Sequence, residues 1–308
     1  MRRRSLLFIL ALAAAAAGGV RAHAEEAARL NVVATFSILG DFARNVGGDR
    51  VNVTALVGPD SDTHVYTPTP EDAKRVSEAK LVIVNGLGLE GWLPRLVKSS
   101  GDRAIVVAAT KGIVPRKPPE GGDHGHAVDP HAWQAVPNAK IYVTNIRDAL
   151  IAADPASAEI YRGNAQAYLA ELDKLDGDVR TAVESIPANR RRVISTHDAF
   201  GYFAAAYGIA FIAPQGVSTE AEVSARDIAA IVRQIRAEAI PAVFLENITD
   251  PRLMRQIASE TGARIGGTLY SDSLTGEKGE APTYIAMVRH NIKALTSALS
   301  GQGPPRGR

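Results

Sequence analysis

The sequence alternates short apolar runs with helical stretches, and one unbroken helical stretch divides this alternation into two sets. Because alternating strands and helices are typical of parallel sheets covered by helices, we predict an α/β protein with two lobes, each containing a mostly parallel sheet and flanking helices. The expected strands are Leu30–Thr35, Val51–Val57, Leu81–Asn85 and Ala104–Ala108 in the first lobe, and Arg192–Thr196, Ala242–Leu245 and Arg264–Leu269 in the second. The expected helices lie around Ile38–Val46, from Pro70 onward, and over Ala199–Tyr207, Ala225–Ala239, Pro251–Thr261 and Thr283–Leu299.

The helical stretch between the two sets runs over Asp154–Ser185, with apolar residues recurring at helical spacing. Asp154 is suited to cap its start, Pro155 suits the first helical position, and Pro187 follows its end. About 30 helical residues span roughly 45 Å at a rise of about 1.5 Å per residue. We therefore expect one long, rigid backbone helix to join the two lobes, in place of a flexible linker.

The first 24 residues have the three parts of a secretory signal peptide. Arg2–Arg4 are positively charged, Leu6–Ala17 is apolar, and Ala22–Ala24 matches a cleavage site between small residues. The apolar run is shorter than the roughly 20 residues of a membrane span, so we expect cleavage, with an uncleaved N-terminal anchor as the alternative. The chain contains no cysteine, so we expect neither a disulfide nor a lipid anchor. This favours a protein that lies free in the periplasm.

This organisation divides the chain into five parts. They are a signal peptide (1–24), an N-terminal α/β lobe (25–153), the linking backbone helix (154–186), a C-terminal α/β lobe (187–300) and a disordered tail (301–308). Residues 115–128, rich in Pro and Gly, are expected to form a loop. Without the four Arg of the signal peptide, the 35 basic and 33 acidic residues become 31 and 33, which argues against a nucleic-acid partner.

Three histidines and one aspartate occur in loops that follow expected parallel strands. They are His64 and His131 in the first lobe, and His197 and Asp272 in the second. In open parallel α/β sheets, ligands bind beyond the carboxyl ends of the strands. Three imidazoles and one carboxylate suit a tetrahedral zinc ion. We therefore predict a metal site at the lobe interface, with two ligands from each side.

Other roles for these four residues are open on placement alone. A histidine after a strand is often a hydrogen-bonded loop residue, and an aspartate often caps a turn. A zinc-dependent hydrolase, with Asp272 as a base and water as the fourth ligand, is a further alternative. Against the hydrolase, the chain has no H-E-x-x-H motif, and Asp272 as a fourth protein ligand would close the site.

Five segments form an ordered set from about residue 30 to residue 299: DTHVYTPTPEDAKRVSEAKLVIVNGLGLEGWL, DPHAW, STHDAFGYFAAAYGI, VFLENITDP, and GTLYSDSL with TYIAMVRHNI. These segments resemble the TroA-like family of zinc/manganese solute-binding receptors of ABC importers. The resemblance implies two α/β lobes joined by a long helix, with the metal bound by His64, His131, His197 and Asp272. It also implies a periplasmic receptor, not an enzyme, that delivers the metal to an importer permease in the inner membrane. We expect this receptor to be a monomer.

The resemblance favours zinc, with manganese or iron as alternatives. Family members with Glu at the position of His197 tend towards manganese, whereas His occurs there in zinc-type and mixed-metal receptors. Zinc-selective members often carry a loop rich in His and acids near His124 and His126, so these residues form either a weak auxiliary zinc site or a solvated loop. Glu246, at the end of a strand, either orients a ligand histidine or caps a helix.

Two further motifs point to different chemistry, and we set both aside. Gly86–Gly91 matches G-x-G-x-x-G after a strand, but Glu90 would repel a pyrophosphate, so we expect a turn there that leads into a helix carrying Trp92. Ser195, His197 and Asp198 have the residue types of a hydrolytic triad, but near neighbours at a strand end do not converge. The chain also lacks a G-x-S-x-G motif.

Overall fold

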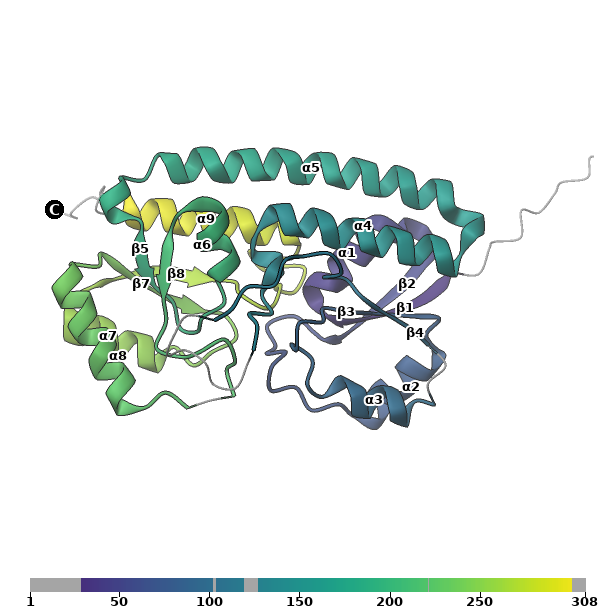
Figure 1. Cartoon of the computed structure of the whole chain (residues 1–308), viewed down its shortest axis with the longest axis horizontal. Helices are drawn as coiled ribbons and strands as arrows, with labels where there is room; N and C mark the ends of the chain where they lie inside the picture. The colour runs from purple at the N-terminus through teal and green to yellow at the C-terminus, as the bar shows by residue number, and fades with distance from the viewer. Residues whose placement is uncertain (1–28, 102–103, 119–126, 221, 301–308) are drawn as a thin grey trace, which may run out of the picture.

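The computed structural model describes residues 29–101, 104–118, 127–220 and 222–300 (Figure 1). Within these ranges, no helix has both the length and the apolar character that a membrane span requires. Three predictions lie outside the described residues: the signal peptide 1–24, the proposed role of His124 and His126, and the disordered tail 301–308.

The N-terminal lobe contains a four-stranded, parallel sheet with the order β2-β1-β3-β4. Its elements are β1 (Leu30–Phe36), α1 (Ser37–Gly47), β2 (Val51–Val57), α2 (Pro70–Glu78), β3 (Leu81–Val84), α3 (Leu93–Ser99), β4 (Ile105–Ala108) and α4 (Val136–Ala153). Val32 belongs to an apolar cluster with α1 and α4, whereas its neighbour Val33 belongs to a cluster with α2 and α3. Helices therefore cover both faces of the sheet, which explains why its strands are nearly continuous apolar runs.

The C-terminal lobe repeats this arrangement, with a parallel sheet in the order β6-β5-β7-β8. Its elements are β5 (Arg192–Ile194), α6 (Gly201–Tyr207), β6 (Ala210–Ile212), α7 (Ala225–Glu238), β7 (Ala242–Glu246), α8 (Arg252–Thr261), β8 (Arg264–Leu269) and α9 (Tyr284–Leu299). Val193 faces the cluster that includes α6 and α9, and Ile194 faces the cluster with α7 and α8. The predicted fold class, two α/β lobes with parallel sheets, is confirmed.

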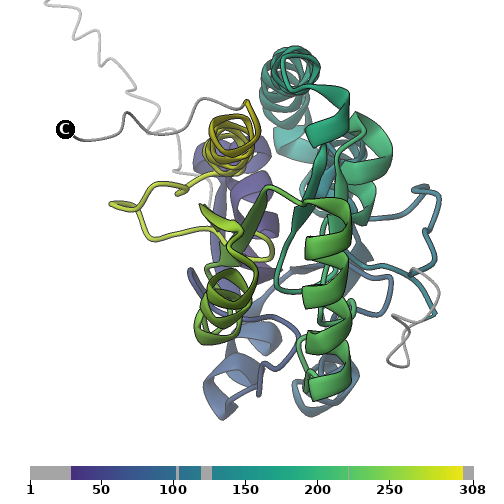
Figure 2. The ribbon, with the colours of Figure 1, turned by 90° about the vertical axis from the view of Figure 1, so that its left-hand side faces the viewer.

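A single long helix, α5 (Ala158–Glu184, 27 residues), extends over both lobes (Figure 1). Its buried residues recur every three or four positions: Tyr161, Ala165, Tyr168, Leu172, Leu175, Val179 and Val183. This face packs on α1, α4 and α9, and Figure 2 shows α5 and α9 side by side, viewed nearly along their axes. At about 1.5 Å per residue, α5 is about 40 Å long. The predicted joining helix is confirmed.

The start of this helix differs from the prediction. Pro155–Ser157 forms a 3-10 turn, and α5 begins at Ala158 instead of after Asp154. The Asp154 carboxylate accepts a hydrogen bond from the Tyr161 hydroxyl at 2.8 Å. Other short 3-10 turns are η1 (Gly48–Arg50), η2 (Ala132–Gln134) and η4 (Ala188–Arg190).

Two elements were not predicted. Helix α4 is amphipathic, with buried Ala139, Val143, Ile146 and Leu150 at helical spacing, so its sequence pattern contained the signal. Strand β6 has only three residues, none fully buried, and a run this short has no periodicity that distinguishes it from a loop.

The two lobes share one continuous apolar core. The cluster that lies under α5 contains side chains from β1, α1 and α4 of the first lobe and from β5, α6 and α9 of the second. At its centre, the Phe42 ring lies 5.8 Å from Tyr142, 6.3 Å from Tyr168 and 4.8 Å from Tyr284, measured between ring centroids. Asp41 Oδ2 also accepts the N–H of Tyr284 at 2.9 Å, at the first turn of α9.

From this shared core and α5 we predict that the lobes move little relative to each other when a ligand binds between them. Solution X-ray scattering of the metal-free and zinc-loaded protein measures the radius of gyration in both states. We expect nearly equal values, because closing a wide hinge would have to break the packing around Phe42. A large compaction on metal loading would contradict this prediction.

Candidate metal site

Loops that leave the carboxyl ends of strands in both sheets meet between the lobes. His64 follows β2, and His131 follows β4 through a long connection that ends at η2. His197 follows β5, and Asp272 follows β8. The structure thus brings together all four residues that the sequence analysis selected, two from each lobe, as expected for parallel sheets.

The four side chains form a tight cluster. One candidate donor atom from each lies within 4.8 Å of the other three. The Nε2 atoms of His64 and His131 are 3.2 Å apart. Asp272 Oδ2 lies 3.2 Å from Nε2 of His64 and 3.2 Å from Nε2 of His197, and Asp272 Oδ1 lies 3.7 Å from Nε2 of His131. In a tetrahedral zinc site with bonds of about 2.0–2.1 Å, neighbouring donor atoms are roughly 3.3–3.4 Å apart, so these separations suit one small cation.

The cluster is withdrawn from water. His131, His197 and Asp272 are 0% exposed, and His64 is 6% exposed. Both carboxylate oxygens of Asp272 and Nε2 of His197 are buried and form no hydrogen bond of suitable geometry with the described residues. A buried carboxylate without partners is costly, and a coordinated cation removes that cost. The donor set therefore fits a divalent metal ion.

The ring of His131 is oriented by Asp129. Asp129 Oδ1 accepts the backbone N–H of His131 at 2.9 Å and also lies 2.9 Å from its Nδ1. With Nδ1 donating to this carboxylate, Nε2 presents a lone pair to the cluster. The backbone carbonyl of Asp129 accepts the Tyr202 hydroxyl at 3.2 Å, which connects this turn to the second lobe.

The ring of His197 is oriented by Glu246, at the end of β7. Glu246 Oε2 lies 2.5 Å from His197 Nδ1, while Oε1 accepts the backbone N–H groups of Thr196 at 2.7 Å and His197 at 3.0 Å. Of the two roles predicted for Glu246, orientation of a histidine is the one that the structure supports. The carboxylate fixes both the ring and the backbone that carries it.

The segment that carries Asp272 is fastened to the first lobe. The carbonyl oxygen of Ser271 accepts Nε1–H of Trp133 at 2.9 Å and the side-chain amide of Gln134 at 2.6 Å. Both donors lie in η2, directly after His131. Trp133 is fully buried. Its bond to Ser271 also helps to fix the position of Asp272 relative to His131.

Sequence reasoning missed Asp129 and Asp62 as positioning residues. Both precede a candidate ligand by two positions, in Asp62-Thr63-His64 and Asp129-Pro130-His131. In both turns the aspartate Oδ1 accepts the N–H of the histidine, at 2.8 Å and 2.9 Å. The repeated D-x-H spacing was therefore a readable signal for these two residues.

Burial and the neighbouring charges shift the pKa values of all four side chains. Burial by itself lowers the pKa of His131, but the negative charge of Asp272 and the hydrogen bond to Asp129 outweigh burial and raise this pKa to about 9. Against the same effect of burial, Glu246 and Asp272 raise the pKa of His197 well above its usual value. Burial lowers the pKa of His64. Although burial opposes ionisation, the neighbouring histidines hold the pKa of Asp272 well below its usual range.

The motifs set aside in the sequence have structural roles. Glu90 is buried, and its carboxylate accepts the backbone N–H groups of Asn85 at 2.6 Å and Gly86 at 3.1 Å, which closes the glycine-containing turn on itself. The Ser195 hydroxyl donates to the backbone carbonyl of His197 at 3.1 Å instead of to its ring. Neither segment forms the site that its motif suggests.

Comparison with known proteins identifies relatives along nearly the whole described chain. Residues 32–298 match the family described as "ZnuA: Zinc-uptake complex component A periplasmic". The chain is 37% identical over 275 residues to the iron-binding protein YfeA of Yersinia pestis, covering 89% of this chain and 88% of that protein. It is 36% identical over 297 residues to the manganese-binding lipoprotein MntA of Halalkalibacterium halodurans, covering 96% and 97%.

Among solved structures, the periplasmic zinc-binding protein TroA from Treponema pallidum has a similar fold. The TM-score is 0.83 at 32% sequence identity, and the match covers 89% of this chain and all of that one. The range of the family match, residues 32–298, includes strands of both sheets and all four clustered residues.

We predict that Glu246→Gln weakens zinc binding about 10- to 100-fold, because the amide cannot accept from His197 Nδ1 in the way the carboxylate does. Asp129→Asn should have an effect of the same kind through His131. Competition with a chelator of known affinity measures the change. Glu71→Gln, at an exposed surface position, is the matched control. Unchanged zinc affinity in Glu246→Gln would refute the orienting role.

Metal affinity should rise with pH, and the contribution of His131 should level off near pH 9. In the metal-free site at neutral pH, His131 holds a proton because its pKa is raised to about 9, and His197 holds one for a similar reason. A metal ion must displace these protons when it binds. Each bound proton therefore contributes about a tenfold gain in metal affinity per pH unit, up to the pH at which its histidine is deprotonated without metal. Titration calorimetry with zinc from pH 6 to 9.5 measures this dependence, and a flat profile would rule it out.

Proposed function

Because the chain belongs to the family of periplasmic zinc-uptake components, we propose that it is an extracytoplasmic receptor that binds one divalent metal ion and delivers it to an ABC importer. The ion binds between the lobes, and its ligands are His64, His131, His197 and Asp272. The observation that supports these ligands most directly is the buried Asp272 carboxylate, whose oxygens form no well-aligned hydrogen bond within the described part of the chain and face three imidazole Nε2 atoms.

We propose zinc as the preferred ion. Three imidazole nitrogens and one carboxylate are a common zinc donor set, and nitrogen-rich sites bind zinc more tightly than manganese or ferrous iron. The similar structure from Treponema pallidum is named as zinc-binding. The second candidate is a manganese or iron receptor, because relatives at 36–37% identity are named for those metals. Donor-atom geometry alone suits all three ions.

The transport role is preferred over catalysis. The family consists of transport components, which agrees with the expectation that the chain is not an enzyme. Four protein ligands also leave a tetrahedral ion without an open position for substrate. All four come from one chain, so we propose that the receptor acts as a monomer.

We propose that residues 1–24 direct export and are removed, and that the receptor works in the periplasm. Its partner is the permease of an importer in the inner membrane. Several relatives are named lipoproteins, whereas this sequence has no cysteine. Mass spectrometry of protein recovered from the periplasm determines the mature N-terminus and any attached lipid.

We predict that the mature protein binds one zinc ion per chain and that Asp272→Ala loses most of this affinity. Removing Asp272 deletes one of the four candidate ligands and the only negative charge among them. Native mass spectrometry gives the stoichiometry, and chelator competition gives the affinity. Asp178→Ala, at an exposed position of α5, is the control and should bind zinc like the wild type.

Competition between zinc, manganese and ferrous iron on the same protein decides between the two candidate metals. Retention of zinc at equal metal concentrations supports the zinc receptor, and retention of manganese or iron supports the second candidate. Binding of none of these ions would reject the proposed function. Ester or amide hydrolysis that disappears in His197→Ala would support an enzyme instead.

A further inference from the structure

The three histidines of the site are held in different ways. Two of the rings are fixed through Nδ1 by a buried carboxylate, either Asp129 or Glu246. The described residues provide no such bond to Nδ1 of His64, and its backbone N–H is held instead, by Asp62 Oδ1 at 2.8 Å. Since His64 is also the one candidate ligand of the four with residual exposure, it is the least constrained of them.

Asp62 connects the turn of His64 with the second lobe. Its Oδ1 accepts the His64 N–H, and its Oδ2 accepts the hydroxyl of Thr219 at 2.6 Å. The backbone carbonyl of Thr219 in turn accepts a hydrogen bond from the side-chain amide of Gln215 at 2.9 Å, and this bond helps to fix the position of Thr219. A hydroxyl that donates to an ionised carboxylate forms a charge-assisted bond, which is stronger than a neutral one.

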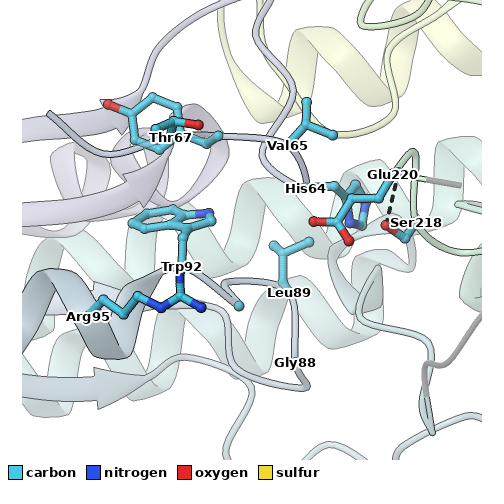
Figure 3. A pocket seen from close by; sticks show the side chains of 11 residues that line it. His64, Val65, Thr67, Gly88, Leu89, Trp92, Arg95, Ser218 and Glu220 are labelled. Carbon is cyan, nitrogen blue, oxygen red and sulfur yellow. Dashed lines mark hydrogen bonds between the residues drawn. The ribbon is translucent and has the colours of Figure 1, made fainter.

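A pocket of about 460 Å³ opens beside His64 (Figure 3). Leu89 and Trp92 of the first lobe line it, together with Ser218 and Glu220 of the second lobe. Of the four candidate ligands, His64 alone lines this pocket. The pocket is therefore the place where solvent comes closest to the buried cluster, and its wall in the second lobe is the segment that contains Thr219.

The base of the His64 loop is fastened separately. The N–H of Asp60 donates to the carbonyl of Leu274 at 2.9 Å, and the N–H of Ser61 donates to Ser273 Oγ at 3.3 Å. These bonds hold the start of the loop against the segment that carries Asp272, and neither involves Thr219. Near the tip, Trp92 Nε1 donates to the Thr63 carbonyl at 3.0 Å within the first lobe. The Asp62–Thr219 bond instead holds the tip to the second lobe, next to the ligand and the pocket.

We propose that the hydrogen bond between Asp62 and Thr219 is a latch that keeps His64 on the bound metal ion, and that its rupture opens the route through the pocket. Asp62 and Thr219 are positioning residues that act on the ion through His64. This inference rests on the proposed metal-binding function. With the base of the loop fixed, breaking this bond releases the tip from the second lobe and loosens His64 without separating the lobes.

The latch is placed where a docking partner has access to it. Glu220 follows Thr219 directly and is exposed, while Thr219 itself is half-buried. A partner that displaces this segment would pull the hydroxyl of Thr219 away from Asp62. The ion would then leave on the side where His64 faces the pocket.

The test is the rate at which zinc dissociates from a Thr219→Val variant of the mature protein. Valine retains the shape of threonine but cannot donate a hydrogen bond to Asp62. Loss of a bond to a charged acceptor corresponds to roughly a 10- to 100-fold change, so we expect dissociation to be faster by about that factor. Stopped-flow mixing of the zinc-loaded protein with an excess of a coloured chelator measures this rate.

Two comparisons separate the latch from a general loss of packing. Thr219→Ser keeps the hydroxyl and should restore slow dissociation, and Thr296→Val removes a hydroxyl that bonds only within α9 and should behave like the wild type. The melting temperature of each metal-free variant reports on folding, and Thr219→Ala replaces the valine variant if that variant does not fold. Wild-type dissociation from Thr219→Val, or equally fast dissociation from Thr219→Ser, would overturn the latch.

The failure of the latch and the failure of the proposed function give different results. If the wild type binds zinc tightly and Thr219→Val releases it at the wild-type rate, the latch is wrong and the receptor function stands. If the wild type binds neither zinc, manganese nor ferrous iron, the proposed function is wrong and the latch falls with it.

Discussion

The buried carboxylate of Asp272 is the constraint on which the rest of the site depends. It is 0% exposed, and its two oxygens face three imidazoles without making well-aligned hydrogen bonds to any residue that the structure describes. An ionised group in such a place requires a compensating positive charge, which either protons on the histidines or a metal ion can supply. Asp129 and Glu246 fix the rings of His131 and His197 through Nδ1, so that Nε2 of each ring can exchange a proton for the metal ion without reorienting.

Much of the fold could be predicted from the sequence, because buried strands and long amphipathic helices have local signals. Val51–Val57 and Arg264–Leu269 agree with β2 and β8 to the residue. The start of α5 was placed too early, because Asp154 and Pro155 suit a 3-10 turn as well as an α-helix. Helix α4 was overlooked although its pattern was present.

The candidate ligands were accessible to sequence reasoning for a topological reason, whereas the long-range bonds of the residues that support them were not. Parallel strands place their carboxyl ends together, so polar residues after different strands can be grouped without coordinates. The bond between Asp62 and Thr219 joins residues 157 positions apart, and no local pattern encodes such a partnership. Glu246 is an intermediate example. Its place at a strand end suggested that it orients a ligand histidine, but only the structure identified that histidine as His197.

The continuous core beneath α5 has a consequence for how this protein folds. Phe42 in α1, Tyr168 in α5 and Tyr284 in α9 are far apart in the sequence and pack in one cluster, so neither lobe encloses a complete interior by itself. Each half, synthesised alone, would expose a large apolar surface to water. The chain should therefore denature in a single cooperative transition, and the C-terminal helix α9 must be made before the first lobe is complete.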